Sequence, residues 1–241
     1  MRFRYRWIVG GIGECLMLAG LVGILSGAEQ PPGSAAGEIV TTRSTTNLAV
    51  RQVGPGVFEI GEIRFNKKEK LVKFPAVVNF REGPIEYLVV TSGGKIHESV
   101  FRTHVEPRQI HVAMLLLGAK GAGTNALPED PAQSLPGDRI SVTVSWQADG
   151  KKHFRAGEEF VRDRKRDAAP KKGDWVYNGS RVREDGFAAQ QDGSIISLIT
   201  DPDALVNNPR PGREDDDSWL ANPKALPPLE TPVEVTLQLK P

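Results

Sequence analysis

The sequence predicts an α+β domain in which mixed or antiparallel sheet dominates. Several segments alternate apolar and polar residues with a period of two, which is typical of strands buried on one face. One stretch, at about residues 107–117, is instead apolar nearly all round and predicts a buried helix. No segment repeats along the chain, and we expect a single β-rich domain over residues 48–241.

The first strands are expected between residues 57 and 80. Apolar side chains occupy even positions at residues 58 and 60 but odd positions at residues 63 and 65, which predicts a bulge or turn at Gly61. Residues 72–80 alternate again, with apolar side chains at the even positions. Pro75 lies within this run and cannot donate a ladder hydrogen bond, which favours an edge position.

Three later segments complete the predicted sheet. Residues 85–91 are apolar on both faces except at Glu86, which is typical of a central strand covered on both sides. Residues 140–146 and 233–239 alternate cleanly and predict strands with one buried face.

Two helices are expected. Pro107 suits the first helical position, and the run Ile110–Leu117 is almost wholly apolar. Gly118 follows at the point where a helix C-terminus favours positive φ. A second, short helix is expected at about residues 201–206, with Asp201 as its N-terminal cap.

The N-terminus has the pattern of a cleavable signal peptide over residues 1–28. Three arginines among the first six residues precede the uncharged run Cys15–Leu25. This run is shorter than the ~20 apolar residues that cross a bilayer, so we expect no transmembrane anchor after cleavage. Ser26 and Ala28 supply small residues at the positions that a signal peptidase recognises, which predicts cleavage before Glu29. An uncleaved anchor would place Glu14 within the bilayer, at a cost of roughly 2–3 kcal/mol.

Residues 29–47 are rich in small and polar residues and predict a flexible leader. The expected cleavage removes Cys15, the only cysteine of the chain, so the mature protein would be cysteine-free. Thiol catalysis, disulfides and iron–sulfur ligation are then excluded. Cleavage also removes three of the 31 basic and one of the 30 acidic residues, which leaves a net charge near −1. We therefore expect no nucleic acid as a partner.

Polar candidates gather around one stretch of the chain. Three of the four histidines, His97, His104 and His111, are spaced by seven residues, and Glu98 adjoins the first. The spacing differs from the zinc protease pattern, in which two histidines four residues apart share one helix face. Three interpretations stay open: structural histidines, a ligand-binding site, and a divalent metal held by the three imidazoles, which is the least favoured.

Three further motifs are weak. Residues 118–124 look like a phosphate loop but lack its Gly-Lys-Ser/Thr ending and follow a helix, which favours a flexible loop. Residues 178–180 (Asn-Gly-Ser) fit the N-glycosylation pattern. The acidic run Glu214–Asp217 offers oxygen ligands to calcium, but without the glycine spacing of a calcium loop a charged surface loop is the better interpretation.

Several segments together resemble the YdjY-type domain family of exported bacterial proteins. These segments are residues 85–90 (Ile-Glu-Tyr-Leu-Val-Val), 94–99 (Gly-Lys-Ile-His-Glu-Ser), 107–118, 175–180 (Trp-Val-Tyr-Asn-Gly-Ser) and 193–202. The similarity extends over roughly residues 61–241. It implies a periplasmic or secreted location and brings no particular reaction with it.

The resemblance also draws attention to particular side chains. The most recognisable positions of the family are His97, Glu98 and His111, with Trp175 and Asn178 as weaker candidates. A ferredoxin label that is sometimes attached to such proteins would imply an iron–sulfur cluster, and a mature chain without cysteine cannot ligate one in the usual way.

The expected function follows from these candidates. We expect a non-catalytic exported module that binds an unknown small ligand or an envelope partner near His97, Glu98 and His111, without a cofactor. The alternative is a metal-dependent hydrolase in which the histidines hold the ion and Glu98 acts as the general base.

Overall fold

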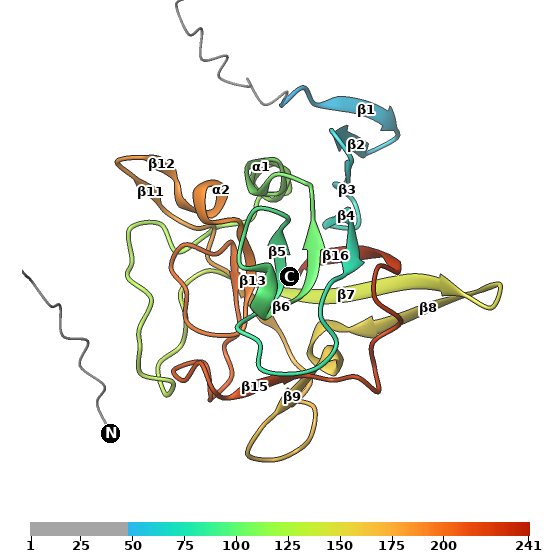
Figure 1. The fold of residues 1–241 in the computed structure, drawn as a ribbon. Coiled ribbons are helices and arrows are strands. Elements are labelled where there is room, and N and C mark those ends of the chain that lie inside the picture. The colour runs from blue at the N-terminus through green and yellow to red at the C-terminus, as the bar shows by residue number, and fades with distance from the viewer. Residues whose placement is uncertain (1–47) are drawn as a thin grey trace, which may run out of the picture. The chain divides into compact units, whose positions relative to one another are not determined.

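Eight strands close into a barrel in the computed structural model, which describes residues 48–241 (Figure 1). In order around the barrel they are β4 (Leu71–Val78), β16 (Pro232–Leu239), β7 (Asp138–Ala148), β10 (Trp175–Tyr177), β14 (Val206–Asn207), β13 (Ser194–Ser197), β5 (Tyr87–Thr91) and β6 (Ser99–Thr103). The signal peptide expected over residues 1–28 and the leader expected over residues 29–47 lie outside the described residues.

The barrel closes where β6 returns to β4. Val77 lies opposite Arg102 and Val78 opposite Phe101. Neighbouring strands run antiparallel, except that β5 is parallel to β6 and β13 is parallel to β14. The sheet is therefore mixed and dominates the fold, as the sequence predicted.

Apolar side chains form one core across the barrel. The central strand β16 pairs with both β4 and β7, so that Val235 lies between Phe74 and Val144 in one cross-strand row. All three side chains are at most 1% exposed. The interior of an eight-stranded barrel is about wide enough for such side chains to fill. A ligand site is therefore expected outside the barrel core.

Further strands extend this sheet or form small sheets of their own. An antiparallel meander of β1 (Arg51–Gly54), β2 (Val57–Ile60) and β3 (Ile63–Asn66) continues from β4, and β8 (Lys151–Ala156) forms a projecting hairpin with β7 (Figure 1). Two-stranded sheets pair β11 (Val182–Arg183) with β12 (Gly186–Phe187) and β9 (Val161–Asp163) with β15 (Trp219–Ala221). The turn expected at Gly61 separates β2 from β3, and its φ is +56°.

Strand β4 changes partners at Pro75. Residues 71–73 pair with β3 and residues 77–78 with β6, so Pro75 faces an unpaired stretch of this edge. The carbonyl oxygen of Pro75 accepts a hydrogen bond of 2.6 Å from the Thr103 hydroxyl. A proline is tolerated here because its nitrogen, which has no hydrogen to donate, faces the same unpaired side of the strand.

The first predicted helix is present as α1 (Pro107–Leu116), with Pro107 in the first turn and Gly118 at φ +87°. The expected burial against the sheet applies to one face of the helix only. Ile110, Ala113 and Met114 are buried, whereas Leu115 is 49% exposed. Because α1 packs on β3, β4 and α2 (Ala188–Asp192) outside the barrel, its other face remains exposed.

The prediction of a second helix at residues 201–206 is wrong. Asp201 caps a turn instead, since its Oδ1 accepts the N–H of Asp203 at 2.8 Å. Leu205 is buried and Val206 enters β14, where it pairs with β10 and β13. Pairing within the barrel therefore overrides the local helix signal. Within the part of the chain that the structure describes, no helix is both long and apolar enough to cross a membrane.

Candidate functional site

A cavity of about 870 Å³ lies against α1. His111 and Leu115 of α1 line it together with residues 121–127, residues 178–182 and Phe187 of β12. Small-molecule sites in proteins typically measure about 300–1,000 Å³. The cavity is therefore large enough for a small ligand, and it contains two of the residues singled out in the sequence, His111 and Asn178.

His111 is half-buried in the cavity wall and is held by one hydrogen bond. Its Nδ1 lies 2.7 Å from the hydroxyl oxygen of Tyr177, a buried residue of β10. The hydroxyl has no other hydrogen-bond partner among the described residues, so we assign it as the donor and place the imidazole proton on Nε2. No described residue accepts a hydrogen bond from Nε2, which leaves this N–H for a ligand.

Burial keeps both partners of this hydrogen bond uncharged. Desolvation lowers the pKa of His111. Desolvation also raises the pKa of Tyr177, and the nearby negative charge of Asp138 raises it further. The ring of Phe187 lies 4.9 Å from the imidazole ring, centre to centre, and adds apolar surface beside it. The pair is therefore a neutral hydrogen bond at pH 7.

Glycines let the loop of residues 121–127 lie close to the end of β10. The N–H of Ala122 donates to the carbonyl oxygen of Asn178 at 2.7 Å. A Cβ at position 121 would lie 2.3 Å from that same oxygen. This distance is too short for any side chain, so the position requires glycine. Gly179, at φ +82°, lies against His111. Residues 121–124 of one weak sequence motif and residues 178–180 of the other thus form one wall of the cavity.

Arg213 binds the segment that follows this loop, at residues 128–133. No pattern in the sequence indicated this arginine. Its side chain is 1% exposed and donates to the carbonyl oxygens of Pro128, Asp130 and Gln133 and to the Thr200 hydroxyl, at 2.6–3.1 Å. Its Nε is buried without a partner. The loop lies some 80 residues before Arg213, so no local pattern signals the contact.

His97 and Glu98 lie on a 3₁₀ turn, η1 (Ile96–Glu98), and neither lines the cavity. The His97 side chain is 76% exposed, and its Nε2 lies 3.6 Å from Glu98. Lys95 pairs with Glu98 at 3.4 Å and with Glu86 at 3.3 Å. Burial, and next the charge of Glu98, raise the pKa of Glu86. These residues form a surface network of charges centred on Lys95.

The three histidines have separate partners. His104 is exposed and contacts Glu62, His97 lies beside Glu98, and His111 bonds to Tyr177. Among residues 48–241, no group of three potential metal ligands within reach of one ion includes a histidine. The structure therefore does not bring His97, His104 and His111 together.

Trp175 is a core residue of β10. Its indole N–H donates to the buried carboxylate of Glu158 at 3.3 Å, and the guanidinium of Arg210 lies 5.2 Å from the centre of its ring. Burial lowers the pKa of Arg210, although the charge of Glu158 opposes this. Trp175 does not line the cavity.

Asn178 lines the cavity, but its amide group serves the fold. Its Nδ2 donates to the carbonyl oxygen of Pro136 at 2.6 Å, and its Oδ1 accepts from the amide of Asn207 at 3.0 Å. The residue is 3% exposed. The amide nitrogen that the N-glycosylation pattern requires is therefore inaccessible in the folded chain.

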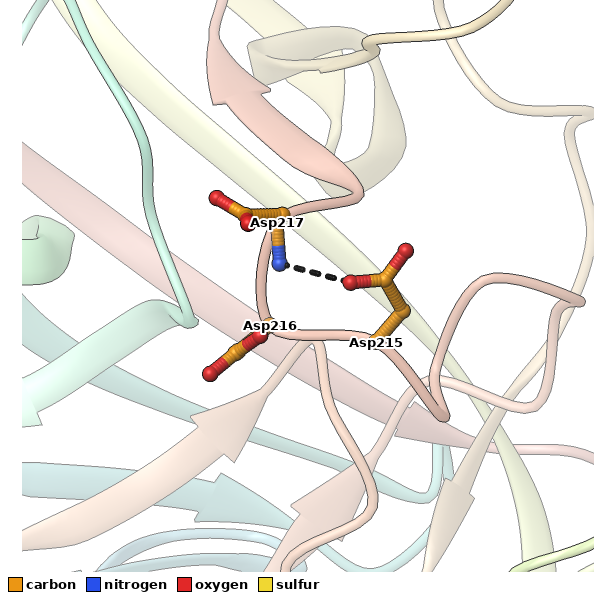
Figure 2. Close-up of side chains that lie close together, drawn as sticks. All are labelled: Asp215, Asp216 and Asp217. Carbon is orange, nitrogen blue, oxygen red and sulfur yellow. Dashed lines mark hydrogen bonds between the residues drawn. The ribbon is translucent and has the colours of Figure 1, made fainter. Parts of the chain in front are cut away.

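Figure 2 shows the acidic loop of Asp215, Asp216 and Asp217, whose carboxylates lie close enough to share a cation. Asp215 already accepts two hydrogen bonds, from the N–H of Asp217 at 3.0 Å and from the hydroxyl of Ser218 at 3.1 Å. These two bonds lower its pKa, the backbone bond more strongly. Asp216 and Asp217 are exposed, as in an ordinary charged surface loop.

The fold and the cavity define a closed β-barrel module with a ligand-sized cavity against its one long helix. A family model described as the YdjY domain matches residues 63–238, from the first residue of β3 into β16. The chain belongs to the YdjY domain family, as the sequence segments indicated. No curated protein and no solved structure matches the chain.

Proposed function

We propose that this chain is an exported bacterial protein whose barrel domain binds a small ligand, without catalysis, in the cavity at His111. The observation that carries the proposal is the imidazole of His111, which is fixed by Tyr177 and leaves its Nε2 without a partner among the described residues. A fixed donor in an 870 Å³ cavity is typical of a binding site, because few well-placed polar groups orient a ligand there.

The hydrogen bonds around His111 favour binding over nucleophilic catalysis. The hydroxyl of Ser180, which also lines the cavity, donates to the carbonyl oxygen of Asp203 at 2.7 Å and not to the imidazole. A serine nucleophile requires a base within hydrogen-bond reach. The alternative of a metal-dependent hydrolase lacks a supporting observation, because His97 and Glu98 do not line the cavity that contains His111.

The proposal is tested by screening a fragment library for compounds that raise the melting temperature of the protein. We expect His111→Ala to weaken the binding of such compounds roughly tenfold, because one hydrogen bond to the ligand is lost. His97→Ala is the matched control, since that imidazole is exposed and outside the cavity.

Two outcomes contradict the proposal. The first is a library without any stabilising compound, or with compounds that are indifferent to His111→Ala. The second is loss of binding in the double variant His97→Ala with Glu98→Ala while His111→Ala still binds, which would place the site at η1. A melting temperature measured without ligand shows for each variant whether the fold is retained.

A further inference from the structure

The walls of the His111 cavity are mainly apolar. The apolar side chains among its lining residues are Leu115, Ala122, Ala126, Leu127, Val182, Phe187 and Pro202. Two of them form an exposed rim, since Leu115 is 49% and Val182 is 79% exposed. A single exposed apolar side chain is common on protein surfaces and needs no explanation, but these two border the same cavity. An apolar ligand would remove both from water.

No unpaired charge faces this space. Arg181 is the only lysine, arginine, aspartate or glutamate among the lining residues. One edge of its guanidinium is bound to the carboxylate of Asp203, at 2.6 Å from Nε and 3.2 Å from Nη2, so its charge is paired. A carboxylate or phosphate ligand would therefore find no free cation here, and an amine would find no free anion. A charge that is buried without a partner is strongly disfavoured.

The polar side chains of the lining are mostly committed to the fold. The amide of Asn178 bonds to Pro136 and Asn207, and the hydroxyl of Ser180 bonds to the backbone of Asp203 and Ala189. The amide of the exposed Asn125 donates to the carbonyl oxygen of Ala122 at 2.9 Å. The Nε2 of His111 and the hydroxyl of the exposed Thr124 remain as donors. The cavity therefore combines apolar walls with very few fixed hydrogen-bonding groups.

We infer that the cavity takes an uncharged, mainly apolar ligand whose single polar group, such as a hydroxyl or carbonyl, accepts a hydrogen bond from His111. This inference rests on the proposed function and specifies the ligand class for that site. It distinguishes the cavity from a site for anionic metabolites, which would present an unpaired arginine or lysine.

Three molecules with one chain length and different head groups test the inference: 1-decanol, decanoate and decylammonium. Each competes with the neutral fluorescent probe N-phenyl-1-naphthylamine at about pH 7, where the last two are charged. We expect decanol to displace the probe at roughly tenfold lower concentration than either charged compound. His111→Ala should weaken decanol binding, whereas the exposed control His97→Ala should not.

A charge added at the rim provides a second, independent arm. Leu115→Lys should improve decanoate binding relative to decanol, because it supplies the missing cation at an exposed position that tolerates it. Leu229→Lys, at a leucine that is 56% exposed and outside the cavity lining, should leave the preference unchanged.

Each outcome decides between the two proposals. If a charged compound binds as tightly as decanol and the binding depends on His111, the inference is overturned and the binding function stands. If neither the probe nor any of the three compounds binds, the inference is overturned, and the fragment screen alone decides the binding function. Decanol preference without dependence on His111 also overturns the inference, since the polar contact would then be wrong.

Discussion

At the scale of single residues, the function proposed here depends on the hydrogen bond between His111 and Tyr177. The buried hydroxyl of Tyr177 fixes the tautomer and the orientation of the imidazole, so that the Nε2 proton is available to a ligand. Burial lowers the pKa of His111, which preserves this arrangement at pH values where an exposed histidine begins to take up a proton. One tyrosine thus sets the chemistry of the site.

The lowered pKa of His111 predicts a pH-dependent stability. Between the folded and unfolded pKa values the unfolded chain binds a proton that the folded chain does not, so the free energy of unfolding falls as the pH decreases below about 6.5. The loss stops below the folded pKa, where both states are protonated. Urea unfolding at several pH values should show this slope in the wild type and a smaller one in His111→Gln.

His97→Gln serves as the control in the same titration. Its imidazole is exposed on η1 and does not contact the pair of His111 and Tyr177, so the variant should keep the slope that is assigned to His111. Equal slopes in the wild type and in His111→Gln would contradict the assignment of a buried, neutral imidazole.

At the scale of elements, the loop between α1 and β7 is what turns one face of α1 into a cavity wall. Its first part is bound to Asn178 through the N–H of Ala122, and Lys120 bonds to Asp138 through both its N–H and its carbonyl. Its later part is bound by Arg213. A segment that is rich in glycine and proline is thus held by contacts at both ends, which fixes the shape of the site.

Arg213→Met tests the role of that arginine. Three backbone carbonyl groups would lose a charged donor, and we expect the free energy of unfolding to fall by about 3 kcal/mol. Limited proteolysis should then cut the loop faster than in the wild type. Arg164→Met is the matched control, because this arginine is half-exposed and pairs with Asp217 at the surface, where an ion pair contributes at most about 1 kcal/mol. Similar stability of the two variants would contradict this role.

At the scale of the whole molecule, the apolar core that stabilises the closed barrel and the cavity proposed to bind a ligand lie in different places. The C-terminal strand β16 lies between β4 and β7, so residues from both ends of the described chain share one wall. The core is filled by their apolar side chains, and the cavity lies against α1 instead. Substitutions of exposed residues at the cavity can therefore alter binding while the core stays intact.

Export is a prediction for the whole chain that rests on residues 1–28. The mass of the protein from a periplasmic extract should correspond to a chain that begins at Glu29, because Ser26 and Ala28 suit a signal peptidase. Ala28→Arg should leave the precursor uncut, whereas Ala35→Arg, beyond the cleavage site, should not. A periplasmic chain that begins at Met1 would contradict the prediction.

Part of the site could be predicted from the sequence. His111 attracted attention as a polar residue on an apolar helix, and it lines the cavity. Its partner Tyr177 lies 66 residues later, and nothing local in the sequence predicts that pairing. The grouping of His97 with His111 rested on proximity in the chain, whereas η1 and α1 make different contacts. Asn178 lies at the cavity, but its amide is used by the fold.

The sequence by itself determined the local features of this protein: the period-two strands, the start and end of α1, the turn at Gly61 and the membership of the YdjY domain family. These depend on side-chain alternation, capping and glycine geometry, which act within a few residues. Only the tertiary structure decided that residues 206–207 join a barrel wall and that Arg213 and Tyr177 shape the cavity. Such contacts join segments far apart in the chain, and their energy arises only when the barrel closes.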